Sequence, residues 1–269
     1  MKKILLAIFL CFSFVNGQPK LSAVGHVKDS ASQKFTVGLD NYFNCEYKNG
    51  KRFHYTWEDE ENSGYSELGK LIETLGGNIL SIETAPTEKI LQPLSMYIIV
   101  DPDIPSENPN PNYIDKTSRK VIVDWVKSGG ILLVLANDSL NCEFTNLNLL
   151  TDNFGIHFNG DSKNRVVGKN YDMGKIDSFP KHPLFEEVKS IYLKEISTLA
   201  LIKPAKCVLE EEGNCIIASS EFGKGFVFAV GDPWLYNEYY DNRKLPTEFE
   251  NYKAAKNLFG WLKNKIHRK

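Results

Sequence analysis

Carboxylate and amide residues recur where apolar stretches of this sequence end. They follow four such stretches, at Asp40-Asn41, Asp101-Pro102-Asp103, Asn137-Asp138 and Gly231-Asp232. If these stretches are parallel strands, their carboxyl ends share the edge at which open α/β sheets bind ligands. Paired carboxylates can supply the acid and the base of glycoside hydrolysis. Asp101, Asp138 and Asp232 are therefore the candidate catalytic residues.

Two loops are expected to bring further polar and aromatic residues to the same edge. The first contributes His54, Trp57 and Glu58, and the last contributes Trp234, Asn237 and Tyr239. Indole and phenol rings can pack against sugar faces, while carboxylates and amides hydrogen-bond sugar hydroxyls. The pattern predicts a carbohydrate site. From the strand ends, its ligand-binding candidates are Asp101, Asp103, Asn137 and Asp232.

The same strand-end residues also have a purely structural interpretation. Asp and Asn are favoured helix N-caps and turn formers at strand-to-helix corners, whether or not a ligand binds there. Capping does not explain the aromatic residues nearby. Both interpretations remain open at this stage.

A nucleophilic enzyme is less well supported by the sequence. The turn after the apolar stretch 131–136 is the place for a nucleophile on a strained elbow, but it reads Asn137-Asp138-Ser139. It has no GxSxG motif, and Cys142 comes several residues late. Ser139 or Cys142 would need His54 or His157 as a base, brought in from a distant loop.

Hydrophobic periodicity predicts the elements that position these residues. Strands are expected at 34–39, 78–82, 96–100 and 131–136, separated by helical patterns around 68–75 and 121–126. The continuous apolar strands favour a parallel sheet with helices on both faces. A polar stretch, 159–190, is expected to be an insertion, and an antiparallel hairpin with a final strand and a closing helix is expected beyond it.

Composition and charge exclude several classes of protein. The 269 residues are 42% hydrophobic and 25% charged, which is typical of a globular chain. Because 32 basic residues face 34 acidic ones and no basic run occurs, nucleic acid is not an expected partner. No metal-ligand or phosphate-loop spacing is present, so we expect neither a metal nor a cofactor.

The N-terminus indicates export. Residues 1–3 include two lysines, residues 4–15 are apolar, and Asn16-Gly17 is a small, turn-prone end, as in a secretory signal peptide. The apolar run is too short to cross a bilayer. We expect a signal peptide at 1–17 and one domain at 18–269 with its core at about 34–266. The protein should be periplasmic, with no membrane span after cleavage.

Four cysteines follow the predicted cleavage point, namely Cys45, Cys142, Cys207 and Cys215. If Glu210 faces Cys215 in the expected hairpin, the pleat puts Cys207 and Cys215 on opposite faces. A bond between them is therefore not expected. The sequence leaves a pairing of Cys45 with Cys142 open.

Four motifs carry a resemblance that covers about residues 35–262: FHYTWED (53–59), YIIVDPD (97–103), ENPNPNY (107–113) and FVFAVGDPWLYNE (226–238). They are similar to the domain appended to many bacterial unsaturated rhamnogalacturonyl hydrolases. That domain resembles the flavodoxin-like fold of class I glutamine amidotransferases. The chain lacks the amidotransferase Cys-His pair, so that activity is not implied. The residues matched in these motifs are His54, Trp57, Glu58, Asp101, Asp103, Asp232, Trp234, Asn237 and Glu238.

The resemblance implies a role in bacterial breakdown of polysaccharides that contain uronate and rhamnose, such as pectin rhamnogalacturonan or ulvan. The leading hypothesis is an accessory or glycan-binding protein whose partner is an oligosaccharide or polysaccharide. One alternative is a hydrolase that acts on unsaturated uronyl oligosaccharides through paired carboxylates. Another is a structural module that docks onto a catalytic glycoside hydrolase.

Overall fold

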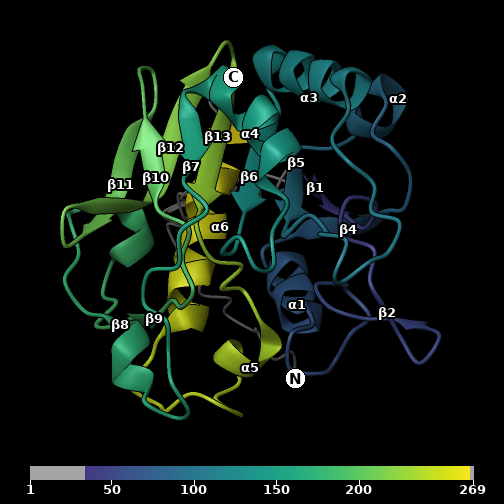
Figure 1. The fold of residues 1–269 in the computed structure, drawn as a ribbon. Coiled ribbons are helices and arrows are strands. Elements are labelled where there is room, and N and C mark those ends of the chain that lie inside the picture. Colours follow the sequence, from purple (N-terminus) through teal and green to yellow (C-terminus); the bar gives the residue numbers. More distant parts are fainter. Residues whose placement is uncertain (1–33, 267–269) are drawn as a thin grey trace, which may run out of the picture. The chain divides into compact units, whose positions relative to one another are not determined.

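One mixed sheet organises residues 34–266, the part of the chain that this computed structural model describes (Figure 1). Its parallel half has the order β4-β1-β5-β6-β13. The strands are β1 (Phe35–Asp40), β4 (Gly77–Ile82), β5 (Met96–Val100), β6 (Ile131–Leu135) and β13 (Gly225–Val230). The predicted signal peptide, residues 1–17, lies outside the described residues.

The other half of the sheet is antiparallel. There β12 pairs with β13, β11 and β10, and β10 pairs with β7. These strands are β7 (Ile156–Phe158), β10 (Leu199–Leu201), β11 (Lys206–Glu211) and β12 (Asn214–Phe222). The predicted α/β class, with a mostly parallel sheet and an antiparallel C-terminal hairpin, is confirmed.

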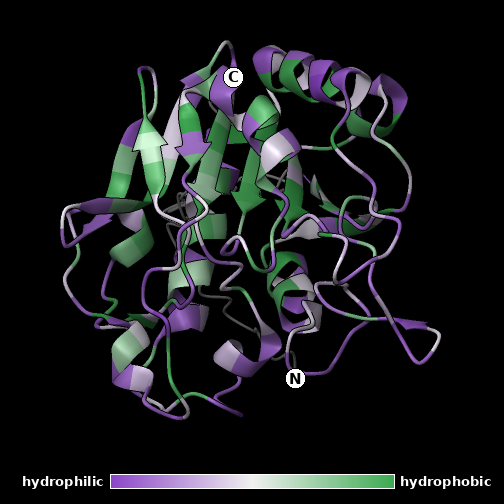
Figure 2. Cartoon of the chain, viewed as in Figure 1, coloured by the Kyte–Doolittle hydropathy of each residue, from purple (hydrophilic) through white to green (hydrophobic). Residues whose placement is uncertain are grey.

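Helices cover both faces of the sheet, as the apolar strands require. The α-helices are α1 (Ser66–Thr74), α2 (Glu88–Leu91), α3 (Lys116–Ser128), α4 (Phe144–Thr151), α5 (Asn237–Tyr240) and α6 (Asn251–Ile266). Alternate residues of β5 supply the two cores: Ile98 packs on the face covered by α1 and α6, and Ile99 on the face covered by α2, α3 and α4. Figure 2 shows the hydrophobic strands between helices that carry polar outer faces.

The structure also contains short strands and 3₁₀ turns, and the sequence analysis did not predict all of them. Two short hairpins pair β2 (Tyr47–Lys48) with β3 (Lys51–Arg52) and β8 (Lys175–Ile176) with β9 (Ile191–Tyr192). Three 3₁₀ turns are η1 (Asp152–Phe154), η2 (Tyr171–Gly174) and η3 (Pro183–Phe185). Strands of two or three residues are too short to produce a readable alternation.

The expectation about Cys207 and Cys215 was wrong, because the two residues form a disulfide with Cα atoms 5.8 Å apart. Glu210 does pair with Cys215, but the register shifts twice between Cys207 and Glu210. A β-bulge adds a residue to one strand and breaks the alternation of faces on which the expectation rested. Cys45 and Cys142 are free thiols.

Removing this disulfide should destabilise the hairpin at the edge of the sheet. The bond joins residues eight positions apart, and closing so short a loop restricts the unfolded chain modestly. The double variant Cys207→Ser/Cys215→Ser should lose about 2–3 kcal/mol of unfolding free energy, measured by urea titration. Cys45→Ser, which breaks no disulfide, is the control, and equal midpoints for all three proteins would contradict the prediction.

Candidate functional site

Four strand ends lie side by side at the carboxyl edge of the sheet. Because β1, β5, β6 and β13 are parallel neighbours, the residues that end them or closely follow them share this edge. These residues are Asp40, Asp101, Asn137 and Asp232. The structure therefore brings together groups that are far apart in the sequence.

The carboxylates at this edge are buried rather than open to solvent. Asp101, Asp103 and Asp232 are 4%, 0% and 1% exposed. A buried carboxylate needs hydrogen-bond donors to compensate for lost water, so the partners of each one show its role.

Two of the carboxylates act as turn caps. Asp40 accepts backbone N–H groups from Tyr42 and Phe43 at 3.2 and 2.7 Å, and its other oxygen accepts the Tyr97 hydroxyl. Asp138 accepts the N–H of Leu140 at 3.0 Å and the Asn141 amide at 2.8 Å. Both residues therefore fit the alternative in which strand-end Asp residues cap turns without binding a ligand. For Asp138, both bonds end on Oδ1 and come from its own turn, as in an Asx turn.

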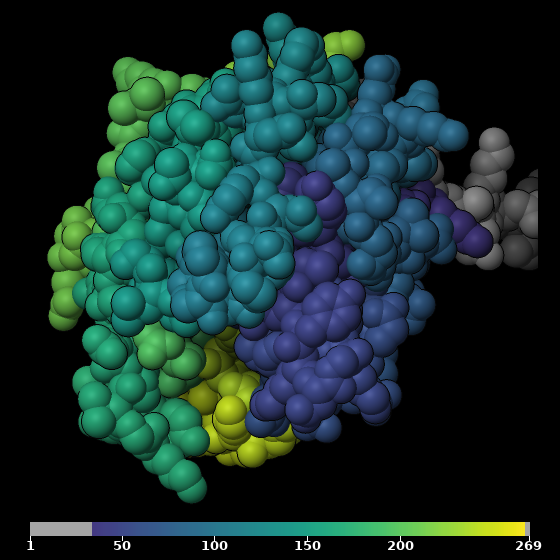
Figure 3. All heavy atoms as spheres, turned by 45° about the vertical axis from the view of Figure 1, so that its right-hand side comes forward, coloured from purple at the N-terminus to yellow at the C-terminus, as the bar shows by residue number. Residues whose placement is uncertain are grey.

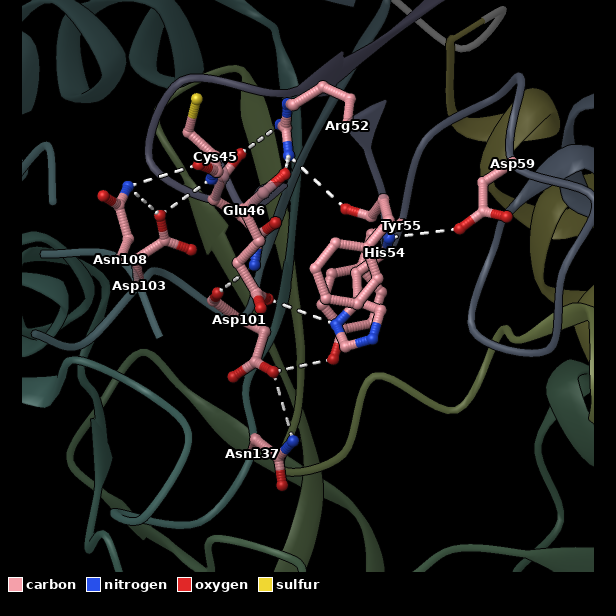
Figure 4. Close-up of polar contacts among 12 residues, drawn as sticks. Cys45, Glu46, Arg52, His54, Tyr55, Asp59, Asp101, Asp103, Asn108 and Asn137 are labelled. Atoms are coloured by element: carbon pink, nitrogen blue, oxygen red, sulfur yellow. Dashed lines mark hydrogen bonds and ion pairs between the residues drawn. The ribbon is translucent and has the colours of Figure 1, made fainter. Parts of the chain in front are cut away.

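Asp101 lies at the centre of a different arrangement (Figure 4). Its Oδ2 accepts the Tyr55 hydroxyl at 2.7 Å and the Asn137 side-chain amide at 3.1 Å. Its Oδ1 has no hydrogen-bond partner among the described residues. The Asn44 side chain donates to its backbone carbonyl at 2.7 Å. Asp101 is thus held firmly by one oxygen and leaves the other oxygen unused.

Backbone strain is concentrated around this carboxylate. Asp101, His54 and Tyr55 all adopt left-handed backbone conformations, with φ of 43°, 61° and 44°. Such conformations are costly for residues other than glycine and gather at functional sites. The sequence analysis considered the turn Asn137-Asp138-Ser139, after β6, as the place for a strained elbow and found no nucleophile motif there; the left-handed residue follows β5 instead.

Three further acids surround Asp101. The His54 ring contacts Glu46, with Nδ1 and Oε1 3.2 Å apart, and Glu46 is almost completely buried. Asp103 accepts the Cys45 N–H at 2.8 Å and the Asn108 amide at 2.7 Å. Its own Oδ1 has no partner among the described residues. The third acid, Glu107, lies near enough for the charge of Asp101 to act on it.

Burial raises the pKa of these acids. Desolvation lifts the pKa of Asp101 to about 8, although Tyr55 and Asn137 oppose the shift, and nearby Glu46 adds to it. The pKa of Glu107 also rises to about 8, through desolvation and then the charges of Asp101 and Glu46. At neutral pH, Asp101 and Glu107 are therefore mostly protonated.

Tyr236 lies near enough to both Asp101 and Asp232 for their charges to act on it. The hydroxyls of Tyr55 and Tyr236 are 3.5 Å apart, and both aspartates contribute to raising the pKa of Tyr236, after desolvation. Asp232 accepts the Lys194 N–H at 2.5 Å, while its Oδ1 has no partner in the described part of the chain. Desolvation raises the pKa of Asp232 to about 7.

The two tryptophans among the candidates are part of the frame. The Trp57 indole donates to the Leu80 carbonyl at 3.1 Å, and its ring lies against Gly69 of α1. Trp234 is completely buried in the core. Since 7% of Trp57 and none of Trp234 is exposed, neither ring offers a face to a sugar.

Asn237 clamps the two loops together. Its Oδ1 accepts the N–H of Glu67 at 2.9 Å, and its Nδ2 donates to the carbonyls of Asp59 and Glu61 at 2.8 and 2.9 Å. It is fully buried. Asn237 therefore joins α5 to the start of α1 and to the first loop, and it acts on a ligand only by positioning other residues.

Open space lies beside these buried groups. A cavity of about 1140 Å³ opens among the first loop, the β2–β3 hairpin and the residues around α5, and we call it the polar cavity. Three predicted residues line it, namely His54, Glu58 and Glu238. Figure 3 shows the purple segment that carries the first loop next to the yellow C-terminal segment on this side.

Both signs of charge line the polar cavity. The cations are Lys48, Lys51, Arg52 and Lys244, and the acids include Glu58, Asp59 and Glu238. Lys244 pairs with Glu238 at 2.6 Å. The Arg52 guanidinium donates to the backbone carbonyls of Asn41 and Glu46, so it shapes the wall. The remaining cations are exposed and can meet a ligand.

The sequence reasoning missed several members of this arrangement. Glu46, Tyr55 and Tyr236 are near neighbours of the predicted residues but were not named. Tyr55 and Tyr236 lie inside the two motifs that were singled out, so those motifs were the signal that could have found them. Glu46 is 55 positions from Asp101, and only the folded chain brings them together.

Neither a metal centre nor a membrane helix is found in residues 34–266. No group of three or more His, Cys, Asp or Glu residues among them is arranged to hold a metal ion. None of their helices is long and apolar enough to cross a bilayer.

Comparison with known proteins gives structural relatives only. No protein-family model matches the chain. No curated protein sequence matches it either. Among solved structures, the mmIFT52 N-terminal domain has a TM-score of 0.66 at 20% identity, covering 84% of this chain and 96% of its own. Cytoplasmic Protein STM1381 from Salmonella typhimurium LT2 has a TM-score of 0.51 at 14% identity, covering 77% and 92%.

A ThuA-like protein from Bacteroides uniformis is also similar, with a TM-score of 0.46 at 12% identity over 85% of this chain and 91% of its own. At such identities the first two similarities show a shared fold, and the third carries no weight. Fold alone does not determine function, because unrelated activities share one architecture. The function of this chain must be argued from its own site.

Loss of the Asn237 clamp should loosen the first loop. Asn237→Ala removes three hydrogen bonds made by a fully buried side chain and should lower the free energy of unfolding by about 2–4 kcal/mol. Urea titration measures the loss, and limited proteolysis should show faster cleavage within 59–64. Asn110→Ala is the control, because Asn110 is exposed and its backbone N–H, which the substitution keeps, donates to the Asn108 side chain. Unchanged stability in Asn237→Ala would rule out the clamp.

The raised pKa of Asp101 predicts how the free energy of unfolding changes with pH. The folded protein holds this proton to about pH 8, whereas the unfolded chain releases it near pH 4. Between these values the folded state binds the extra proton, so this group's contribution to stability falls as pH rises. Asp101→Asn should flatten the decline of unfolding free energy by up to about 1.4 kcal/mol per pH unit between pH 5 and 7.

Urea titrations at several pH values measure this slope. Asp124→Asn, on the exposed face of α3, provides the matched control because Asp124 is paired only with surface Lys120. A slope in Asp101→Asn identical to that of the parent protein would show that Asp101 is ionised in the folded state.

Proposed function

We propose that this protein binds acidic oligosaccharides in the polar cavity, as an exported, periplasmic accessory protein of bacterial polysaccharide degradation. The ligands are fragments of polysaccharides rich in uronate and rhamnose, of the rhamnogalacturonan or ulvan type. The observation that carries the proposal is the open cavity of about 1140 Å³ beside the carboxyl edge, lined by carboxylates, amides and cations together. Sugar hydroxyls need the first two groups, and uronate carboxylates need the third.

Binding fits the geometry better than catalysis does. The three candidate catalytic residues, Asp101, Asp138 and Asp232, are each at most 4% exposed. By contrast, His54 and Glu58 reach the cavity with exposed or partly exposed side chains. A ligand can therefore contact these residues without a rearrangement of the frame. The resemblance to domains appended to rhamnogalacturonyl hydrolases is consistent with such a role.

One observation favours hydrolysis as a second candidate. Asp101 and Glu107 have a pKa of about 8 and so carry a proton at neutral pH, as a general acid must. Loss of absorbance from the 4,5-double bond of an unsaturated uronyl-rhamnose disaccharide would reveal turnover. Turnover that disappears in Asp101→Asn would replace the binding proposal with this one.

Binding is tested by calorimetry with tri-galacturonate. His54→Asn should weaken it about three- to tenfold, as expected for one lost hydrogen bond to the ligand. Asn is chosen because it tolerates the left-handed backbone at position 54, where φ is 61°. The same substitution at His157, which lies outside the polar cavity on β7, is the control and should change nothing. Absence of heat with every acidic and neutral oligosaccharide would reject the proposal.

A further inference from the structure

A second cavity adjoins the polar cavity on the other side of Glu238 and Lys244. It has a volume of about 520 Å³, and these two residues line both spaces. Its other walls come from the loop before η2, from the end of β9 and from α5 with the residues after it. Figure 3 shows a hollow where the green, purple and yellow segments meet. We call this space the cationic cavity.

Positive charge dominates the cationic cavity. Lys169, Lys194, Arg243 and Lys244 line it, and Glu238 is the acid among its lining residues. Lys194, Arg243 and Lys244 each have one carboxylate partner, at 3.0, 2.6 and 2.6 Å. Lys169 is exposed and has no ion-pair partner in the described part of the chain. An anionic group entering here meets more cations than acids.

Lys194 remains a cation although it is partly buried. Desolvation is the largest influence and opposes its charge, but Glu195, Asp232 and Glu238 together outweigh it, so the pKa of Lys194 lies above its ordinary value. A partly buried cation interacts more strongly with an anion than an exposed one, because water screens it less. Its backbone N–H is fixed to Asp232, which places the residue in the wall.

Three tyrosines give the cationic cavity a hydroxyl-bearing wall. Tyr171 and Tyr239 both pack against Tyr192 edge to face, with ring centroids 5.9 and 5.1 Å apart. Tyr192 and Tyr239 line the cavity although only 3% of each is exposed, whereas Tyr171 is more open. None of the three hydroxyls is hydrogen-bonded to another residue between 34 and 266. These hydroxyls are free to bond a polar ring held next to the cations.

We propose that the cationic cavity is a subsite for one anionic sugar ring. The lysines and arginine would bind its carboxylate or sulfate, and the tyrosine hydroxyls its ring hydroxyls. This inference rests on the proposed function, since a chain of sugars occupying the polar cavity would continue into this subsite past Glu238 and Lys244. A neutral sugar of the same size leaves the cations without a partner, so the subsite selects for charge.

The experiment compares ligands that differ in charge alone. Tri-galacturonate and its methyl ester have the same rings, but the ester carries no carboxylate. Calorimetry at low salt should show tighter binding of the acid, and the double variant Lys169→Gln/Lys194→Gln should weaken that binding about five- to twentyfold. Binding of the neutral ester should not change. The exposed Lys206→Gln, on β11, controls for the overall loss of positive charge.

Galacturonate and galactose 6-sulfate, tested as single sugars by saturation transfer, distinguish the two anionic groups. Whichever of them the parent protein binds and the double variant does not is the group that the subsite holds. If the parent binds tri-galacturonate and its ester equally, or if the double variant keeps the preference for the acid, the subsite is disproved while the proposed function stands. Binding of tri-galacturonate that is weakened by the double variant but does not respond to His54→Asn would support the subsite and contradict the polar cavity.

Discussion

The central strands β5, β6 and β13 are buried and apolar on both faces, and this constraint determines the rest of the molecule. Each face of β5 and β6 must be covered, so helices pack on both sides and every crossover returns the chain to the same starting edge. The carboxyl ends then gather at the other edge. Polar residues that follow the strands are brought together there, whatever their separation in the sequence.

The buried acids at that edge fall into two groups, according to whether hydrogen bonds account for their oxygens. Asp40 and Asp138 lie among donors from their own turns, and those bonds account for them. Asp101 and Asp232 each keep an oxygen without a partner among the described residues, although they are nearly inaccessible. A protein tolerates such groups at a cost in stability, and protonation reduces that cost. The local strain at Asp101, His54 and Tyr55 adds to it. Natural selection for folding alone would favour neither feature.

The fold was predictable because its signals are long and local. Five- and six-residue apolar runs, and helices with a clear repeat, identified the parallel half and its order of elements. The Cys207–Cys215 bond was not predictable, because a bulge changes side-chain direction without any mark in the residue types. The burial of Trp57 and Trp234 was missed for a related reason. Their side chains turn inward in response to packing against α1 and the core, which no sequence period records.

The sequence predicted which residues share an edge of the sheet better than it predicted what surrounds them. Parallel topology brings the strand-end residues to one edge, and His54, Glu58 and Glu238 line open space beside it. The residues that surround Asp101 come from three separate segments of the chain, so pairwise spacing could not reveal them. The overall charge did not indicate the cationic cavity either, since a net charge of −2 is compatible with a cavity lined by several lysines.

The contacts of Asn237 also bear on how the molecule is made. The first loop contains Asp59 and Glu61, but it is held by Asn237, which lies 178 and 176 positions later in the chain. The clamp cannot form until that later segment has emerged from the ribosome. A chain cut short before Asn237 would therefore keep most of its sheet-forming residues and still lack a fixed first loop.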